Sequence, residues 1–366
     1  MATKSKIVEP SFRLGSGRYI QEAGATSLVG QEVLRLRASR PLVLMGEHGE
    51  AVAGDAVKAS LKESGLNARF LRYDGFCNPA HCEKILALPE AAGCDVIIGV
   101  GGGNLMDAAK LCAAIGQLPV INIPTSSATC AAFTPLSVMY NDDEQTIGTR
   151  HHLQEVNAVL ADMDILCRQP TRLLVAGIYD ALAKFVEIRQ RLEGKKEEDV
   201  DIGLRSAFVL SDFTYERLLA DLPAAFADVS AGRNSKAVYD SVYISIALTG
   251  VISSLSRGSN QCAIAHKVYE TSRTLFPKTV HSYLHGELVA IGMIAQIAYN
   301  GEEEKAEPFR RQMKQFGMPT SLPELGIPAD EATLMAYYDK IVNSSAMAGT
   351  PPEEQKRLLK SLRLAF

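Results

Sequence analysis

The sequence has no tryptophan, no disulfide framework and no excess of basic charge. Its seven cysteines are an odd number without framework spacing, which favours reduced thiols and a cytoplasmic location. No apolar run approaches the roughly 18 residues that span a bilayer, and the N-terminus lacks the apolar core of a secretory signal, so we expect no membrane partner. The formal net charge of -4 argues against a nucleic-acid partner, because nucleic-acid binders are usually basic.

What the sequence does contain is enough apolar material for two cores. The chain has 366 residues, of which 47% are hydrophobic and 22% charged, and this length exceeds that of one typical domain. Short apolar runs alternate with helical patterns up to about residue 165, which predicts a parallel sheet with right-handed crossovers. The strands are expected at 41–46, 68–73, 95–100 and 119–123, and the helices between them at 50–64, 79–92 and 104–115.

From about residue 170 the pattern is helical, with almost no strand signal. The stronger helical patterns cover 173–192, 201–222, 235–255 and 286–299. We therefore predict an α/β domain over residues 1–165 and a helical domain over residues 166–366. The functional site is expected in the cleft between the carboxyl ends of the strands and the helices.

A glycine-rich loop directly follows the clearest buried strand, 95–100. Gly101, Gly102, Gly103 and Asn104 let the backbone approach a ligand and lead into a helix whose N-terminal amides suit a pyrophosphate. Asp107 follows on the same helix and belongs to the candidate cofactor site. The loop is neither a GxGxxG motif nor a Walker loop, so a tight strand-to-helix turn is the alternative.

Two further segments follow strand ends and can contact a dinucleotide. The loop 124–130 carries the hydroxyls of Thr125, Ser126 and Thr129, which can donate to phosphate or nicotinamide amide groups, although an ordinary Ser/Thr-rich loop has the same composition. Glu47 follows the strand 41–46. A carboxylate there accepts from ribose hydroxyls and repels a 2′-phosphate, which favours NAD over NADP, whereas the alternative is a surface glutamate.

The helical half contains a candidate metal site. Asp180 lies in the apolar pattern AGIYDALAKFVE, where a carboxylate must be paired or ligated. His266 lies in another apolar stretch and His285 opens the pattern HGELVAIG. One carboxylate and two neutral imidazoles suit a divalent ion with positions left open for a substrate. The spacing alone is too loose to distinguish this set from core histidines with ordinary partners.

The motifs taken together resemble a known family. GGGNLMDAAK, PTSSATCAAFTPLSVMY, AGIYDALAKFVE, AIAHKVYE and HGELVAIG occur in this order. The chain resembles the iron-containing alcohol dehydrogenase superfamily in its glycerol dehydrogenase branch, and TCAAFTPLSVMYN looks closer to the hydroxycarboxylate dehydrogenases. The resemblance implies a dehydroquinate synthase-like architecture, with an α/β N-terminal dinucleotide-binding domain and an all-α C-terminal domain.

The resemblance also implies roles for individual residues. Asp180, His266 and His285 match the ligands of one divalent metal, zinc or iron. Gly103 and Asn104 match the pyrophosphate loop, and Glu47 matches the ribose position. The positions that match the lining of the nicotinamide half are Thr125, Thr129, Thr134, Leu136 and Tyr140.

Three positions depart from the family pattern. Cys130 stands where glycerol dehydrogenases carry an aspartate that contacts the polyol, so glycerol should bind less well and an anionic substrate should be repelled less. Tyr179 replaces the glycine before the metal-binding aspartate, where it can narrow the pocket. Tyr269 replaces a second histidine near the substrate, so a proton relay at that position is lost or moves to the phenol.

The expected function is hydride transfer between NAD(H) and a small substrate, a 2-hydroxy or 2-oxo acid ahead of a small polyol such as glycerol. The metal would act as a Lewis acid on the substrate oxygen. Lys184, one turn after Asp180, either pairs with Asp180 or attracts a substrate carboxylate, and a plain surface lysine is the alternative. His281 is a candidate for proton exchange with solvent or has a structural role.

Two other functions remain open at this point. One is a lyase or cyclase of the dehydroquinate synthase type that uses NAD transiently, for which Lys267 is the only obvious extra basic residue beside a ligand position. The other is a non-catalytic family member. Relatives are commonly dimers or larger rings, so a homo-oligomer is expected.

Overall fold

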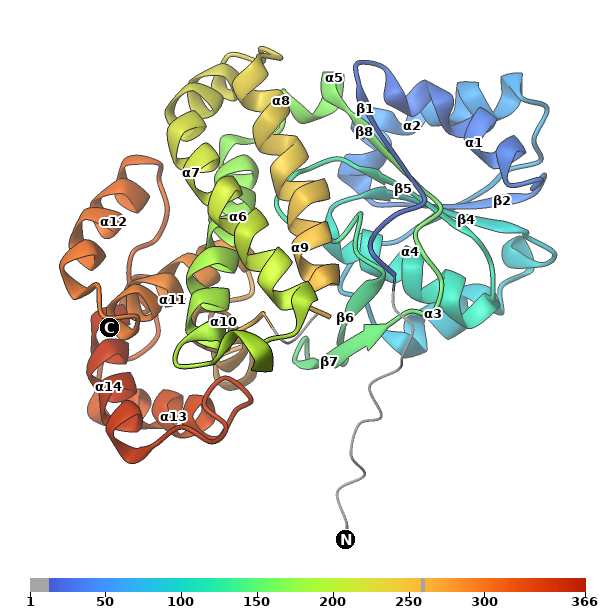
Figure 1. Ribbon diagram of the computed structural model, residues 1–366. Helices are drawn as coiled ribbons and strands as arrows, with labels where there is room; N and C mark the ends of the chain where they lie inside the picture. The colour runs from blue at the N-terminus through green and yellow to red at the C-terminus, as the bar shows by residue number, and fades with distance from the viewer. Residues whose placement is uncertain (1–12, 258–260) are drawn as a thin grey trace, which may run out of the picture.

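The computed structural model describes residues 13–257 and 261–366 (Figure 1). A sheet with helices on both faces forms the N-terminal part of the chain, and a group of helices formed by the C-terminal part lies beside it. The last strand ends at Asp162, and the described residues after it contain helices and connecting segments only. This arrangement confirms the predicted fold class. The domain limits at 165 and 166 stay a prediction.

Six parallel strands make up the main sheet, in the order β1-β8-β5-β4-β2-β3. The central strand β4 lies between β2 and β5, and its Ile97 is opposite Leu42 of β2 and Val120 of β5. The strands are β1 (Arg18–Glu22), β2 (Pro41–Met45), β3 (Arg69–Arg72), β4 (Val96–Gly101), β5 (Val120–Pro124) and β8 (Ala158–Asp162).

Helices cover both faces of this sheet, which explains the continuous apolar runs in its central strands. Leu42 and Leu44 of β2 point into the core shared with α3 and α4, whereas Val43 and Met45 point into the core shared with α1 and α2. The helices of this part are α1 (Val29–Arg35), α2 (Glu47–Glu63), α3 (Pro79–Leu86), α4 (Gly103–Gly116) and the short α5 (Met163–Leu166).

An antiparallel hairpin, β6 (Leu136–Tyr140) and β7 (Thr146–His151), stands apart from the main sheet. The buried Lys110 of α4 donates to the carbonyls of Thr134 (2.9 Å) and Leu136, which fixes the start of the hairpin over α4. This hairpin, the outer strand β1 and its neighbour β8 were not predicted from the sequence.

Long helices form the second part of the chain. Their packing is dominated by α6, α7, α10 and α11, which contact one another through buried aliphatic side chains. The helices are α6 (Thr171–Leu192), α7 (Ile202–Ser230), α8 (Lys236–Tyr243), α9 (Thr249–Leu255), α10 (Ile264–Leu275), α11 (His285–Tyr299), α12 (Glu303–Gln315), α13 (Glu331–Val342) and α14 (Pro352–Leu362).

One helical segment corrects an expectation from the sequence. Residues Lys236–Leu255, which run through α8, a π-helical turn and α9, form the one described helix that is long and apolar enough to cross a membrane. The statement that no run approaches that length was therefore wrong. This segment is 67% buried inside the protein, as the core helix of a globular protein would be.

Candidate active site

A cleft separates the carboxyl ends of the strands from the helices, and it has an outer and an inner part. The outer cleft, of about 560 Å³, receives the glycine loop from one side and the segment before α11 from the other. The inner pocket, of about 230 Å³, adjoins it. Both parts are lined by Gly103, Asn104, Thr129, Tyr140, Tyr269 and His285.

The structure brings every candidate site residue of the sequence analysis to this cleft. Those that line the outer part alone are Glu47, Gly101, Gly102, Thr125, Ser126 and His281. Those that line the inner part alone are Asp107, Cys130, Thr134, Leu136, Asp180, Lys184 and His266. Residues from the two halves of the chain thus meet around one continuous space.

The glycine loop joins β4 to α4 within three residues. Gly101 ends the strand, Gly102 precedes the helix in an extended conformation and Gly103 begins the helix. A Cβ at Gly103 would lie 2.9 Å from Oγ1 of Thr129, so a glycine is required where the two loops meet. At Gly102 the nearest atom to an added Cβ is Oγ of Ser126 at 3.9 Å, which leaves that backbone open to the cleft.

Asp107 and Lys110 have partners within the protein. The two side chains form an ion pair of 2.8 Å, and Asp107 also accepts from the amide of Val138 at 3.1 Å. Burial raises the pKa of the Asp107 carboxyl, against the charge of Lys110, which lowers it. These contacts give Asp107 a clear structural role in holding the hairpin on α4, although its side chain still lines the inner pocket.

Glu47 opens α2 at the rim of the outer cleft and is largely exposed. Its carboxylate pairs with Arg72 at 2.8 Å, and Arg72 also pairs with Asp74 at 2.5 Å. Glu47 was predicted from the sequence, whereas Arg72 at the end of the neighbouring strand β3 and Asp74 just after it were not. Because two carboxylates surround one guanidinium, this part of the rim has a net negative charge.

Three helices bring the candidate metal ligands together. Asp180 lies in the middle of α6, His266 in the first turn of α10 and His285 at the start of α11. Oδ1 of Asp180 lies 3.4 Å from Nε2 of His266 and 3.4 Å from Nε2 of His285, and the three donor atoms lie within 4.8 Å of one another. With bonds of about 2.1 Å, a tetrahedral ion would separate its ligands by roughly 3.4 Å. The donor set therefore fits a divalent ion.

Glycines allow these helices to approach so closely. A Cβ at Gly286, next to His285, would lie 1.9 Å from the carbonyl oxygen of Ala176 in α6. A Cβ at Gly292 of α11 would lie 2.5 Å from the carbonyl oxygen of Ala265 in α10. The backbones are in direct contact at both points, so these two glycines set the distance between the ligand-bearing helices.

The charges in the inner pocket are buried and matched. Burial alone would raise the pKa of Asp180, but the charges of Lys184 and His285 hold it well below its usual range. Burial alone would lower the pKa of Lys184, but the Asp180 carboxylate raises it. Lys184 therefore stays an ammonium group, 3.4 Å from Oδ1 of Asp180 and 3.1 Å from Nε2 of His266. Burial lowers the pKa of His285, which favours the neutral form that binds metals.

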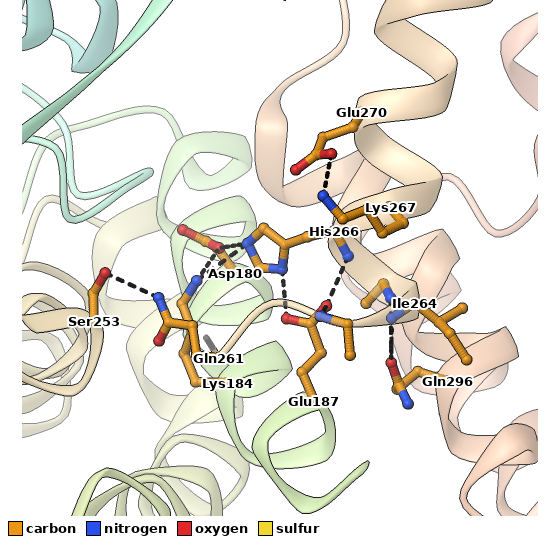
Figure 2. Close-up of polar contacts among 12 residues, drawn as sticks. Asp180, Lys184, Glu187, Ser253, Gln261, Ile264, His266, Lys267, Glu270 and Gln296 are labelled. Carbon is orange, nitrogen blue, oxygen red and sulfur yellow. Dashed lines mark hydrogen bonds and ion pairs between the residues drawn. The ribbon is translucent and has the colours of Figure 1, made fainter. Parts of the chain in front are cut away.

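A carboxylate that the sequence analysis missed orients His266 (Figure 2). Glu187 is completely buried, and its Oε1 accepts from the amides of Ala263 and His266, both at 2.8 Å. Its Oε2 lies 2.5 Å from Nδ1 of His266. Donation from Nδ1–H to Glu187 directs Nε2 toward Asp180 and Lys184. Burial alone would lower the pKa of His266, but the Glu187 charge raises it to about 10, so an ion that binds here must displace the proton on Nε2. Glu187 lies seven residues after Asp180 on α6, a spacing that places both on one helix face.

The three departures from the family pattern have different consequences. Cys130 lines the inner pocket, and burial raises the pKa of its thiol to about 12, so this position is neutral. The hydroxyl of Tyr269 lies 3.0 Å from that of Tyr140, and its ring lies against His285. Tyr179 lines neither part of the cleft; it is fully buried with its ring against Phe309, so the expectation that it narrows the pocket was wrong.

His281 lines the outer cleft and does not line the inner pocket with Asp180 and His266. Its Nδ1 pairs with the Glu144 carboxylate on the β6–β7 turn, and its ring packs edge-on against Phe76. This places His281 as a contact between the two halves of the chain at the mouth of the site. A role in proton exchange with solvent stays a prediction.

A glycine loop that faces a set of metal-ligand donors across one cleft defines a metal-dependent oxidoreductase that uses a dinucleotide. Comparison with known proteins gives the family. The family model described as iron-containing alcohol dehydrogenase matches residues 16–164. The chain is 31% identical to the glycerol dehydrogenase of Pseudomonas putida over 323 residues, which cover 87% of this chain and 86% of the relative.

Two further relatives agree with this result. The hydroxycarboxylate dehydrogenase A of Escherichia coli K12 is 30% identical over 332 residues, 90% of this chain and 88% of that protein. The crystal structure of a probable glycerol dehydrogenase from Sinorhizobium meliloti 1021 has the same fold, with a TM-score of 0.81 and 24% identity over 96% of this chain and 98% of that one. The chain belongs to the iron-containing alcohol dehydrogenase family, in its glycerol dehydrogenase branch. The resemblance seen in the motifs is thereby confirmed.

Proposed function

We propose that the protein transfers a hydride between NAD(H) and a small 2-hydroxy acid or the corresponding 2-oxo acid. The relatives named above divide between glycerol dehydrogenases and a hydroxycarboxylate dehydrogenase, so the family alone leaves the substrate open. The choice depends on the charge of the inner pocket.

The observation that carries this choice is that Lys184 and Cys130 line the same inner pocket. Lys184 supplies a buried positive charge beside Asp180, and Cys130 supplies a neutral thiol. The carboxylate of a 2-oxo acid would lie near the Lys184 ammonium group, and no carboxylate at position 130 would repel it. A polyol would lose the negatively charged hydroxyl acceptor that the family's aspartate provides.

The metal would be held by Asp180, His266 and His285, a set that suits either zinc or iron. When bound, the ion supplies Lewis-acid stabilisation of the substrate oxygen, and the nicotinamide supplies the hydride chemistry. Glu187 directs Nε2 of His266 toward Asp180 by holding a proton on Nδ1. The phenol pair of Tyr269 and Tyr140 lies beside His285, where the inner pocket adjoins the outer cleft.

The dinucleotide would lie along the outer cleft. Gly102 and Gly103, with the first amides of α4, would hold its pyrophosphate, and Thr125, Ser126 and Thr129 would donate to its polar groups. Glu47 would accept from the adenosine ribose hydroxyls, and the acidic rim that it forms with Asp74 disfavours a 2′-phosphate. NAD is therefore the proposed cofactor.

The test replaces the two residues that distinguish the substrates. Cys130→Asp should lower kcat/KM for reduction of a 2-oxo acid such as pyruvate by about tenfold or more, because it places a negative charge beside the carboxylate. The same variant should raise kcat/KM for dihydroxyacetone. Lys184→Gln should raise KM for the 2-oxo acid and leave KM for dihydroxyacetone nearly unchanged.

Cys130→Ser is the matched control, because it keeps a small neutral side chain and should keep the preference for the 2-oxo acid. Metal content is measured for every variant, since Lys184 contacts two candidate ligands. Unchanged substrate preference in both Cys130→Asp and Lys184→Gln, with the metal bound, would reject the acid substrate and favour a polyol.

We also propose that the protein acts as a homo-oligomer in the cytoplasm. Helix α7 exposes an apolar stripe formed by Ile202, Val209 and Phe213, with exposed fractions of 78%, 64% and 60%. These positions share one helix face, which suits a contact with another subunit. All seven cysteines are free thiols, which suits a reducing compartment. Light scattering of the Val209→Asp and Phe213→Asp variants tests the contact: a smaller assembly supports it, and an unchanged mass contradicts it.

A further inference from the structure

The outer cleft contains a buried cation that the function described so far does not use. Arg273, in the last turn of α10, is only 5% exposed. Within the described part of the chain, its side chain makes one hydrogen bond, from Nη2 to the carbonyl oxygen of Tyr283 at 2.7 Å. Its Nε is buried without a hydrogen-bond partner, and no carboxylate within residues 13–257 and 261–366 forms an ion pair with it.

A second arginine, Arg172, contacts a residue of the outer cleft and shows how a guanidinium with a carboxylate partner is bound in this protein. Arg172 donates from Nε and Nη2 to the Glu287 carboxylate at 2.6 and 2.7 Å, and also to the carbonyl of Ser282. Arg273 is more deeply buried and has one carbonyl in place of this bidentate partner. A buried charge without an anion is unfavourable, so Arg273 has the features of a group whose partner is a ligand.

Aromatic rings fix the direction of this side chain. The guanidinium carbon of Arg273 lies 6.0 Å from the centre of the Phe76 ring and 5.9 Å from that of Tyr269. Such contacts and the nearby end of α10 offset part of the cost of burial, but neither replaces an anion. The rings hold the planar donor group in place before a ligand arrives, which is the property of a prepared binding site.

The position of Arg273 shows which ligand it can meet. Arg273 lines the outer cleft together with the glycine loop, Ser126 and Tyr283, and it does not line the inner pocket with Asp180. The outer cleft is the space proposed above for the dinucleotide. An arginine fork matches the oxygens of a phosphate or a carboxylate, and both would be present in a complex with cofactor and substrate.

We propose that Arg273 binds an oxyanion of the ligand in the cleft, either a phosphate of the dinucleotide or the carboxylate of the substrate. The inference rests on the proposed function, because it takes the outer cleft to be the dinucleotide site. Bound ligand would then complete the hydrogen bonding of Arg273.

The test is equilibrium binding of NADH, measured by fluorescence titration of the wild type and the Arg273→Gln variant. Loss of a charge-assisted hydrogen bond predicts a rise in Kd of about tenfold to a hundredfold. The variant should also show a shallower dependence of Kd on salt concentration, because one charge contact is missing. Neither readout depends on turnover.

A second arm distinguishes the source of the oxyanion. Oxamate, an unreactive analogue of a 2-oxo acid, is titrated against the NADH complex of each protein. Weaker NADH binding by Arg273→Gln assigns the contact to a phosphate. Unchanged NADH binding with weaker oxamate binding assigns it to the carboxylate. Either result supports a binding role for Arg273.

Arg310→Gln is the matched control, because Arg310 also donates to backbone carbonyls, those of Thr320 and Leu364, but lies outside the cleft. It should lower the melting temperature without changing either Kd. If Arg273→Gln behaves in the same way, Arg273 is structural and the inference is overturned. If the wild type itself fails to bind NADH, the proposed function fails with it, and the two failures are thereby distinguished.

Discussion

The two sides of the cleft are built in different ways. The glycine loop offers backbone amides from one short segment, and its shape depends on the absence of side chains at Gly102 and Gly103. The opposite side offers side chains from α6, α10 and α11, which are far apart in the sequence. Changes to the candidate metal ligands on the helical side should therefore remove chemistry, whereas changes on the glycine-loop side should mainly weaken binding.

The largest effect is expected for Asp180→Asn, which removes the one charged donor of the proposed metal site. Metal content should fall, and kcat/KM should fall by about a thousandfold or more, because the ion would stabilise the developing negative charge by several kcal/mol. Metal analysis and steady-state kinetics measure the two effects. Asp221→Asn, a buried carboxylate that pairs with Arg217 away from the cleft, should keep both metal and activity. Full activity of the Asp180 variant would contradict the metal site.

The next effect concerns the packing that brings the ligands together. Gly286→Ala places a methyl group 1.9 Å from the carbonyl oxygen of Ala176, so α6 and α11 must separate. We expect a loss of about 3 kcal/mol in the free energy of unfolding, together with weaker metal binding. Urea unfolding of the metal-free protein measures the first quantity. Wild-type stability of this variant would show that the contact between the two helices is looser than described.

Glu187→Gln keeps the candidate metal ligand His266 in place but changes which of its ring nitrogens carries the proton. The glutamine amide would donate to Nδ1 of His266, which moves the ring proton to Nε2 and blocks that atom as a ligand. Metal affinity should fall by about tenfold to a hundredfold, and the melting temperature of the metal-free protein should change little by comparison. A large loss of stability with unchanged metal affinity would make Glu187 a purely structural residue.

On the opposite side of the cleft, Gly102→Ala is the corresponding change. The added Cβ meets only Ser126 Oγ at 3.9 Å, so stability should stay within about 0.5 kcal/mol of the wild type. The methyl group would point into the outer cleft and should raise the Kd for NADH by about tenfold. Metal content should not change. Wild-type NADH affinity would show that the dinucleotide does not approach this loop.

The smallest effect is a pH dependence that belongs to the α/β part. Burial lowers the pKa of His152, whose Nε2 lies 2.8 Å from Oγ of Ser137, to about 3. The unfolded chain takes up this proton near its usual pKa of about 6.5, so the stabilising contribution is present above that value and is lost as the pH falls toward about 3.

As the pH falls from about 7 to about 5.5, protonation of His152 in the unfolded chain should lower the free energy of unfolding by about 1.3 kcal/mol. Urea unfolding at several pH values measures the slope in the wild type and in His152→Gln. The variant should lack this part of the slope. Equal slopes in the two proteins would show that His152 is protonated in the folded state as well.

The same difference between the two sides explains what could be predicted from the sequence. The strands and the glycine loop are local patterns, so β2, β3, β4, β5 and the loop between β4 and α4 were predicted from short segments. The outer strand β1 was missed because only one of its five residues is buried. The hairpin β6–β7 was missed although its turn, Asn141 to Gln145, has the composition of one.

The helical side depends on contacts that the sequence does not display. Asp180, His266 and His285 were grouped as a candidate metal site by residue type alone, and the family resemblance then matched them to metal ligands. Glu187 could have been found from its position on the same face of α6. Arg273 gives no local signal, because its unmatched charge becomes visible only when the residues around it are known.

The most direct test of the account is the reduction of pyruvate and of dihydroxyacetone with NADH, by metal-stripped enzyme before and after zinc or ferrous ion is restored. We predict that activity returns only with metal and that kcat/KM favours pyruvate by about tenfold or more. Activity without metal would contradict the role of Asp180, His266 and His285, and a preference for dihydroxyacetone would contradict the role given to Lys184 and Cys130.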